Sequence, residues 1–473
     1  MKRILSFLLV ASLALVVGCK KEYSVPAIIA PSNQTVEVGA DVDLTFNYTA
    51  DGGFNSSNLI TTNGSSVIKT DGVTGSASGT IVVTFTAGNT VGAGSVLLTL
   101  SDNESQKVSA TAVLDVVGVP TVSVTENIDE DSTWETGKIY ILEGRITVVP
   151  GVTLTIQPGV IIKGREGSGS NATALLVARG AQLMAEGTAS SPIIFTTVAD
   201  QILPGEISSP NMEPGLNGLW GGLLILGNAP ISADAPSVGI EGIPPSDLNG
   251  LYGGTDPLDN SGSIKFISIR HGGANIGEGN EINGLTLGGV GSGTIIENIE
   301  VIANQDDGIE FFGGTVSVSN VIIWNTGDDA IDTDQSWAGT LDNFIVINPE
   351  DECFELDGAE GTMEARHTII NGTIKAGDAE GIADLDDNST LTMNNLYFFG
   401  LKAGQDFDLN PAGLTVSTME ASLPDGALVT DFFKGGSDAA VTIVPAGART
   451  VGADITDFQT WSWTAVSGAL TGF

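Results

Sequence analysis

The chain has 473 residues, of which 57 are Asp or Glu and 18 are Lys or Arg, so its formal net charge is −39. A charge of this sign disfavours nucleic acid and anionic membrane surfaces as partners. The 62 glycines, the frequent Val, Ile and Thr, and the scarcity of helical periodicity favour an all-β protein, and the length leaves room for two or more domains.

The N-terminus has the layout of an export signal. Two basic residues precede a short apolar run at 4–17, which is too short to span a membrane. The sequence VVGC that ends at Cys19 resembles a bacterial lipobox. That resemblance implies a lipoprotein signal peptide at 1–18, lipidation of Cys19, and a tether at 19–27 that holds the protein to the membrane, as in an outer-membrane lipoprotein of the cell envelope. An ordinary signal peptide or a spanning anchor is the alternative.

Residues 28–118 form several runs of alternating apolar and polar residues, separated by Gly, Asn and Asp turns. This spacing predicts a β-sandwich. The opening PSNQTVEVGADVDLTF and the closing ATAVLDV resemble bacterial immunoglobulin-like modules, although the Cys pair and core Trp of antibody domains are missing. Apart from Cys19 the only cysteine is Cys353, so no disulfide within the exported chain is expected, and Cys353 is predicted to be a buried thiol.

Pro120 and the acidic stretch 126–132 mark the start of the second predicted domain, residues 119–473. Similar segments return roughly every 22–28 residues, as in NIEVIANQDDGIEFF, NVIIWNTGDDAIDTD and NFIVINPEDECFELD, followed by two looser copies. Such a period indicates the stacked coils of a parallel β-helix. Each copy starts with an Asn whose amide can hydrogen-bond along the stack, and these residues are Asn298, Asn320, Asn343, Asn371 and Asn395.

Two stretches rich in Pro and Gly, which we call the first and second excursions, interrupt the coils at about 200–217 and 232–261. Loops of this length often cover a groove or carry function. Simple decoration of the coils is the alternative. Aromatic residues in 430–436 and 456–466 predict a cap that covers the C-terminal end of the β-helix.

Segments such as ILEGRITVVPGVTLTIQPGVIIKG, NGLWGGLLILGNAPI and FISIRHGGANIGEGNEINGLTLGG look like those of a group of uncharacterised bacterial surface lipoproteins with right-handed β-helices. The resemblance covers about residues 134–470. It implies the fold and a cell-envelope location, and it brings no activity and no catalytic residues. The expected fold is therefore all-β, a right-handed parallel β-helix preceded by an immunoglobulin-like β-sandwich.

The sequences NQDDG (304–308) and GDDAID (327–332) resemble part of the active site of polygalacturonase-type glycosidases. Carried over, Asp306, Asp328 and Asp329 would supply the acid and base of an inverting hydrolysis. The resemblance then stops, because the next coil has no histidine and no Arg-x-Lys follows. The only histidines, His271 and His367, stand elsewhere in the sequence.

A lyase is the other enzymatic alternative. Such a site needs a cation that stabilises the substrate carboxylate and a Lys, Arg or Tyr base nearby. Only Lys375, Lys402 and Arg366 approach the acidic coils in sequence. The incomplete catalytic sets favour a binding protein over an enzyme.

Acidic residues recur at equivalent positions of the repeats. Strand alternation would place Glu310, Asp332, Glu355 and Asp408 on one face, with apolar residues on the other. Carboxylates stacked about 5 Å apart repel unless cations bridge them, and calcium suits such oxygen ligands. A solvated acidic face without metal is the alternative. The predicted metal ligands are Asp307, Asp329 and Glu352, and the predicted ligand-binding residues are Glu310, Asp332, Asp334, Glu355 and Asp357.

The sequence thus predicts a lipid-anchored protein that presents a β-helix for binding a polysaccharide or another cell-surface ligand, with calcium as the candidate cofactor. A polysaccharide-degrading enzyme and a structural surface component are the alternatives.

Overall fold

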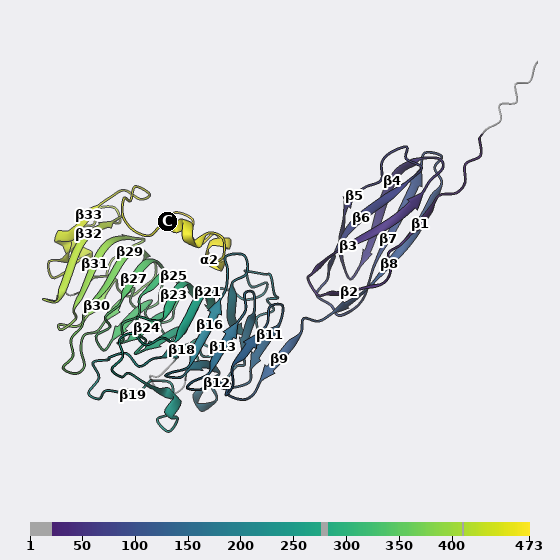
Figure 1. Cartoon of the computed structure of the whole chain (residues 1–473). Coiled ribbons are helices and arrows are strands. Elements are labelled where there is room, and N and C mark those ends of the chain that lie inside the picture. The colour runs from purple at the N-terminus through teal and green to yellow at the C-terminus, as the bar shows by residue number, and fades with distance from the viewer. Residues whose placement is uncertain (1–20, 276–281, 409–410) are drawn as a thin grey trace, which may run out of the picture. The chain divides into compact units, whose positions relative to one another are not determined.

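The computed structural model describes residues 21–275, 282–408 and 411–473, and the chain divides into two compact units, Met1–Val119 and Pro120–Phe473 (Figure 1). The predicted export signal and Cys19 lie outside the described residues. Within those residues, no helix combines the length and the hydropathy needed to cross a membrane.

The N-terminal unit consists of two four-stranded sheets that share one core. Phe46 and Phe85 of one sheet are buried together with Leu98 and Leu114 of the other. The first sheet has the order β1 (Ala27–Ile29), β3 (Asp41–Thr49), β6 (Ser78–Ala87), β5 (Gly64–Thr70), and the second has the order β2 (Gln34–Glu37), β8 (Lys107–Val117), β7 (Gly92–Asp102), β4 (Phe54–Thr62). The alternation pattern did not single out β4 and β5, because Ser, Asn and Thr fill much of both strands. The relation to immunoglobulin-like modules stays a prediction.

The second unit is a stack of parallel strands in two long sheets, which agrees with the all-β prediction. The eight-stranded sheet comprises β12 (Arg145–Val148), β15 (Ala174–Val177), β18 (Leu223–Leu226), β22 (Leu285–Gly288), β24 (Ile309–Phe312), β26 (Ile331–Asp334), β28 (Glu355–Leu356) and β30 (Asp384–Leu385).

The fifteen-stranded sheet runs along the same stack. Its main path comprises β9 (Thr121–Val124), β11 (Ile139–Leu142), β14 (Ile161–Gly164), β17 (Ile193–Thr197), β21 (Gly262–Arg270), β23 (Ile295–Ile302), β25 (Val318–Trp324), β27 (Thr340–Ile347), β29 (His367–Lys375), β31 (Leu391–Phe399), β32 (Leu414–Ala421) and β33 (Val441–Ile443). β10 (Ser132–Trp134), β13 (Thr153–Ile156) and β16 (Gln182–Glu186) pair beside this path.

The remaining elements are short. They are the antiparallel pair β19 (Val238–Gly239) and β20 (Leu251–Tyr252), the helices α1 (Val429–Phe432) and α2 (Trp463–Val466), and the 3-10 turns η1 (Gly169–Asn171), η2 (Leu248–Gly250), η3 (Ser437–Ala440) and η4 (Ile455–Phe458).

Each repeat Asn lies at a bend inside a long strand and not at the start of a coil. The bend has a positive φ, for example 58° at Asn320, a conformation that Asn tolerates better than most residues. Asn320 donates to Asn298 at 3.2 Å and Asn343 donates to Asn320 at 2.8 Å, as the repeat predicts. The ladder is interrupted before Asn371, which donates instead to Asp342.

The two aromatic segments of the C-terminal region lie in different places. Phe433 packs on Phe407 near the last coil, so 430–436 does cover the end of the core. Residues 456–466 instead run back along the outer face of the fifteen-stranded sheet, and α2 lies beside β21 and β25 (Figure 1). Trp461 and Trp463 pack against this outer face because the outward residues of the sheet are apolar, among them Ile322.

The second excursion covers the outer face of the eight-stranded sheet at its early coils. Ile240, Ile243 and Tyr252 pack on Leu224 and Leu226, where the outward residues are apolar. The cover reaches Phe312 in β24, whose ring lies 5.8 Å from that of Tyr252. From β24 onward the outward residues include carboxylates, and the start of the excursion still reaches these coils, where the N–H of Ser232 donates to the carbonyl of Gln335 at 3.2 Å.

Candidate functional site: a carboxylate face on the shorter sheet

Three columns of acidic side chains run across successive coils. We name as the acidic face the outer side of β24, β26, β28 and β30 together with the loops 303–308, 325–330 and 348–354 that lead into the first three of these strands. In the first column, Glu310 pairs with Asp332, Asp332 with Glu355, and Glu355 with Asp384. The residues on either side of Glu310, Ile309 and Phe311, are fully buried in the core, so the alternation predicted for β24 is present.

A second column lies in the loops. The backbone N–H of Asp329 donates to Oδ1 of Asp307 at 3.0 Å, and the N–H of Glu352 donates to Oδ1 of Asp329 at 2.7 Å. The backbone of each coil therefore orients the carboxylate of the coil before it.

The third column contains Asp334 and Asp357. Asp334 lies opposite Phe312 in the strand register, and the N–H of Asp357 donates to the carbonyl of Thr333 at 2.8 Å, which carries Asp357 into line with the residues after β26. The five residues predicted to bind ligand thus lie on one surface of the same sheet.

Three overlapping groups of carboxylates come within metal-binding reach. In each group one ligand oxygen per residue lies within 4.8 Å of the others. The groups are Asp306, Asp307 and Asp328; Asp307, Glu310 and Asp332; and Asp328, Asp329 and Asp351.

These groups change the predicted assignments. Asp307 and Asp329 belong to them, whereas Glu352 belongs to none of the groups found among the described residues. The carboxylate of Glu352 lies over Gly381 of the next coil, where a Cβ would come within 2.1 Å of Oε2, so it points along the stack toward the acids Asp384 and Asp406. Glu310 and Asp351 take its place as candidate metal ligands.

The candidate catalytic residues Asp306, Asp328 and Asp329 lie close together. Oxygens of Asp306 and Asp328, and of Asp328 and Asp329, come within 4.8 Å of each other. Inverting pairs are separated by about 6.5–9.5 Å to admit water, so neither Asp306 with Asp328 nor Asp328 with Asp329 has the spacing of an inverting pair. Sharing a cation fits the spacing better.

The carboxylates are strongly shielded from water. The residues Asp307 and Glu310 are each 6% exposed, and Asp329 is 4% exposed. Burial raises the pKa of Asp307, Glu310 and Asp332 well above the usual range, with a further rise from neighbouring carboxylates. Burial likewise raises the pKa of Asp329 to about 10.

The same effect continues along the face more weakly. Burial raises the pKa of Glu352 to about 8, of Asp334 to about 7 and of Asp357 to about 6. At neutral pH the carboxyl of Glu352 is therefore largely protonated, that of Asp334 is near its midpoint, and that of Asp357 is mostly ionised.

The chain supplies little of that positive charge. In the described part of the protein, none of the ion pairs made by Lys or Arg involves Asp307, Glu310, Asp329 or Asp332. The two histidines are buried elsewhere: His271 contacts Trp463, and His367 stacks on Trp337. The cationic base that a lyase requires is not among these contacts.

Two further polar residues border the acidic face and were not predicted. Asn283 donates through Nδ2 to Glu310 and, at 3.1 Å, to Glu241 of the second excursion. Asn283 is 1% exposed, and its Oδ1 has no hydrogen-bond partner among the described residues. The sequence offered a weak signal for Asn283, which stands two residues before β22 as Asp307 stands two residues before β24.

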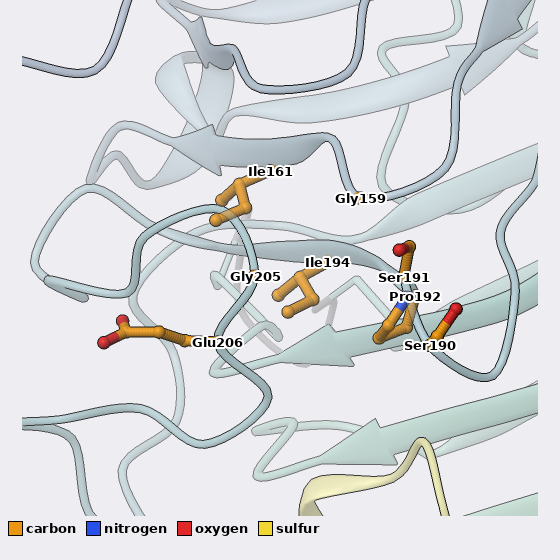
Figure 2. Close-up of a pocket in the computed structure, with 8 residues that line it drawn as sticks. All are labelled: Gly159, Ile161, Ser190, Ser191, Pro192, Ile194, Gly205 and Glu206. Atoms are coloured by element: carbon orange, nitrogen blue, oxygen red, sulfur yellow. The ribbon is translucent and has the colours of Figure 1, made fainter. Parts of the chain in front are cut away.

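A well-enclosed hollow elsewhere is too small for a ligand. It has a volume of about 20 Å³ and lies between the turn at Gly159, the segment 190–194 and the first excursion at Gly205 and Glu206 (Figure 2). This volume holds about one water molecule. The acidic face is the stronger candidate because it brings buried carboxylates such as Asp307 and Glu310 together from successive coils.

A family model described as a pectate-lyase-like β-helix domain matches residues 126–431. The chain belongs to this family. The match includes all the acidic residues of the loops 303–308, 325–330 and 348–354. A comparison with curated proteins found no match.

Solved structures give only remote likenesses. The α-1,3-glucanase of Streptomyces thermodiastaticus, from family GH87, is 12% identical with a TM-score of 0.27 and covers 84% of this chain and 81% of its own. The Yersinia enterocolitica family 28 exopolygalacturonase is 10% identical with a TM-score of 0.21, covering 89% and 90%. The SrpA adhesin of Streptococcus sanguinis is 16% identical with a TM-score of 0.19, covering 24% and 70%. At these scores the likenesses carry no argument about function.

Proposed function

We propose that this pectate-lyase-like β-helix is a binding protein of the cell envelope, anchored by lipid at Cys19, whose acidic face binds a polysaccharide or another surface ligand through divalent cations. The cation that we propose is calcium. The observation that carries the proposal is the set of three overlapping carboxylate groups. The most buried of the three groups consists of Asp307, Glu310 and Asp332.

The physical reason is charge. Carboxylates this close and this buried cannot all be ionised unless a cation neutralises them. Calcium accepts six to eight oxygens in flexible geometry, which suits oxygens contributed by separate coils. The unpartnered Oδ1 of Asn283 is a further neutral oxygen at the same border. A calcium ion that keeps open coordination positions can then take hydroxyl or carboxylate oxygens from a glycan.

A glycan array tests the proposal. The whole chain is applied in calcium and in EDTA, beside Asp332→Asn and beside Asp115→Asn, which removes an exposed acid from the other unit. The proposal expects glycan signals that require calcium, disappear in Asp332→Asn and persist in Asp115→Asn. Signals that are unchanged by EDTA and by Asp332→Asn would refute it.

A second candidate, a polysaccharide-degrading enzyme, is favoured by one observation. The raised pKa of Asp329, about 10, keeps this side chain protonated at neutral pH beside Asp328, as a general acid must be. A reducing-sugar assay together with an assay for unsaturated products separates the candidates. Turnover that is lost in Asp329→Asn would support the enzyme and defeat a purely binding role.

A further inference from the structure

A larger hollow lies on the fifteen-stranded sheet, between the Asn ladder and the C-terminal segment. We name it the ladder hollow. It is open to solvent, has a volume of about 430 Å³, and apart from one glycine every residue that lines it is Asn or Asp. Small-molecule sites have volumes of about 300–1,000 Å³, and a wholly polar lining suits a polar ligand. The lining residues are Asn320, Asp342, Asn343 and Asn371 of β25, β27 and β29, and Asp454 and Asp457 of the C-terminal segment.

The C-terminal segment interrupts the ladder at this point. The N–H of Asp454 donates to Oδ1 of Asn343 at 2.8 Å, and Nδ2 of Asn343 donates to Oδ2 of Asp457 at 3.2 Å. With Oδ1 of Asn343 engaged by the segment, Nδ2 of Asn371 donates to Oδ1 of Asp342 at 2.6 Å. The carboxylates of Asp342 and Asp457 are thus each held through one oxygen at the break in the ladder.

The second oxygen of each carboxylate is left for a ligand. Oδ2 of Asp342 and Oδ1 of Asp457 have no hydrogen-bond partner among the described residues. None of the ion pairs in that part of the chain involves either acid. Arg449, in the same segment, donates to the carbonyls of Val451 and Ala453 at 2.8 and 2.9 Å instead. The ladder hollow therefore favours a ligand with a positively charged hydrogen-bond donor.

Asp454 differs from these two acids. Hydrogen bonds from the hydroxyl and the N–H of Thr456, together with the charge of Arg449, lower the pKa of Asp454. Both hydrogen bonds end on Oδ1. Because Asp454 already has these partners, we assign the charge of a ligand to Asp342 and Asp457.

The ladder supplies hydrogen-bond donors as well. Nδ2 of Asn320 donates to Asn298, and Nδ2 of Asn371 donates to Asp342. Since an amide nitrogen carries two N–H groups, each of these side chains has one left for a ligand. A simple amine would use only the carboxylates, and a neutral sugar would leave their charge unpaired. A sugar that carries an amine would use both sets of groups.

We propose that the ladder hollow binds an amino sugar whose amine is free and therefore charged. The ammonium group pairs with the carboxylates of Asp342 and Asp457, and ring hydroxyls accept from the amides of Asn320 and Asn371. This site needs no metal and is independent of the cation proposed for the acidic face.

Titration calorimetry of the whole chain in EDTA tests this site. The titrations are made at about pH 6, where amines are protonated and ordinary aspartates are ionised, and in about 0.15 M salt, which screens long-range attraction to the acidic protein. The methyl glycoside of glucosamine should bind about ten-fold more tightly than its N-acetyl form, which has the same ring without the charge. Ethanolamine, an amine without the ring, should also bind about ten-fold more weakly.

Two variants and two controls complete the test. Asp457→Asn should weaken binding of the glucosamine glycoside about ten-fold, and Asp342→Asn should do the same if Asp457→Asn does not fold. Asp115→Asn, on the other unit, and Asp332→Asn, on the acidic face, should bind it as the parent chain does. The proposal would be overturned by no binding, by equal affinity for the N-acetyl glycoside or for ethanolamine, or by unchanged affinity in a folded variant of the hollow. None of these results bears on the acidic face, because calcium is absent throughout.

Discussion

The N–H of Asp329 donates to Oδ1 of Asp307 over 3.0 Å, although the two residues lie 22 positions apart. The next coil repeats the arrangement when Glu352 donates to Asp329. In this stack a backbone N–H of the following coil fixes one oxygen of the carboxylates of Asp307 and Asp329. The stacking also brings carboxylates of like charge together where they are buried from water. The mutual repulsion of these charges is an unfavourable term that a bound cation would remove.

We predict that the metal-free protein loses stability as the pH rises. The pKa values of Asp357, Asp334 and Glu352 are raised to about 6, 7 and 8, whereas the unfolded chain holds ordinary carboxyls near 4. A group with a raised pKa stabilises the fold while it is protonated, and this contribution is lost between about pH 4 and pH 8.

Thermal melts in EDTA at several pH values check this prediction. The melting temperature should fall from pH 5 to pH 8, and calcium should restore it at pH 8 much more than at pH 5, because calcium binds the ionised form. A melting temperature that is flat with pH and unaffected by calcium would mean that the carboxylates are simply solvated.

Asp332→Asn should have opposite effects with and without metal. In EDTA at pH 8 the variant should be more stable by about 1 kcal/mol, because the neutral amide avoids the cost of protonating or burying the Asp332 carboxylate and still reaches Glu310. In calcium it should be less stable than the parent chain, because a ligand is lost. Chemical unfolding under both conditions measures the difference, and Asp115→Asn should change stability by less than about 0.5 kcal/mol in either. If Asp332 only stabilises the fold and binds no metal, the variant should be less stable than the parent chain both in EDTA and in calcium.

The Asn ladder should contribute in two separable ways. Asn320→Gly loses the hydrogen bonds to Asn298 and from Asn343 but keeps a residue suited to a φ of 58°, and should lower the free energy of unfolding by about 1 kcal/mol. Asn320→Ala adds the strain of the left-handed conformation and should lose about 2 kcal/mol. Urea unfolding compares the two. Equal losses would show that the positive φ is unimportant there.

Glu300 should be among the most sensitive positions outside the acidic face. Its buried carboxylate accepts the N–H groups of Trp463 and Thr464 at 3.2 and 2.8 Å, and it lies 3.8 Å from Arg270. Glu300→Gln should cost about 3 kcal/mol, since it leaves the Arg270 charge buried and uncompensated. Glu297→Gln, on the same strand but paired with Lys265 at the surface, should cost less than about 1 kcal/mol. Denaturant unfolding of both variants measures the two losses of unfolding free energy. Equal losses would contradict this role for Glu300.

The acidic columns could be predicted from the sequence because two periods determine them. The repeat of about two dozen residues sets which residues stack, and the strand alternation sets which of them point outward, so Glu310 and Asp332 meet as expected. The Asn contacts follow from the same periods.

Features that depend on aperiodic segments could not be predicted. Glu241 reaches Asn283 only because the second excursion packs on an apolar part of the sheet, and no period fixes the path of a loop. The ladder is interrupted because the C-terminal segment places the N–H of Asp454 on Oδ1 of Asn343, 111 residues earlier. Glu352 was assigned to metal because its column is right, whereas the direction of its side chain depends on Gly381.

The most direct test of the central claim is anomalous diffraction from crystals of the whole chain grown near neutral pH with calcium replaced by gadolinium. The account predicts an anomalous peak bonded to oxygens of Asp307, Glu310 and Asp332 at about 2.3–2.6 Å. An acidic face without any peak under these conditions would contradict it, and the carboxylates would then hold protons in place of metal.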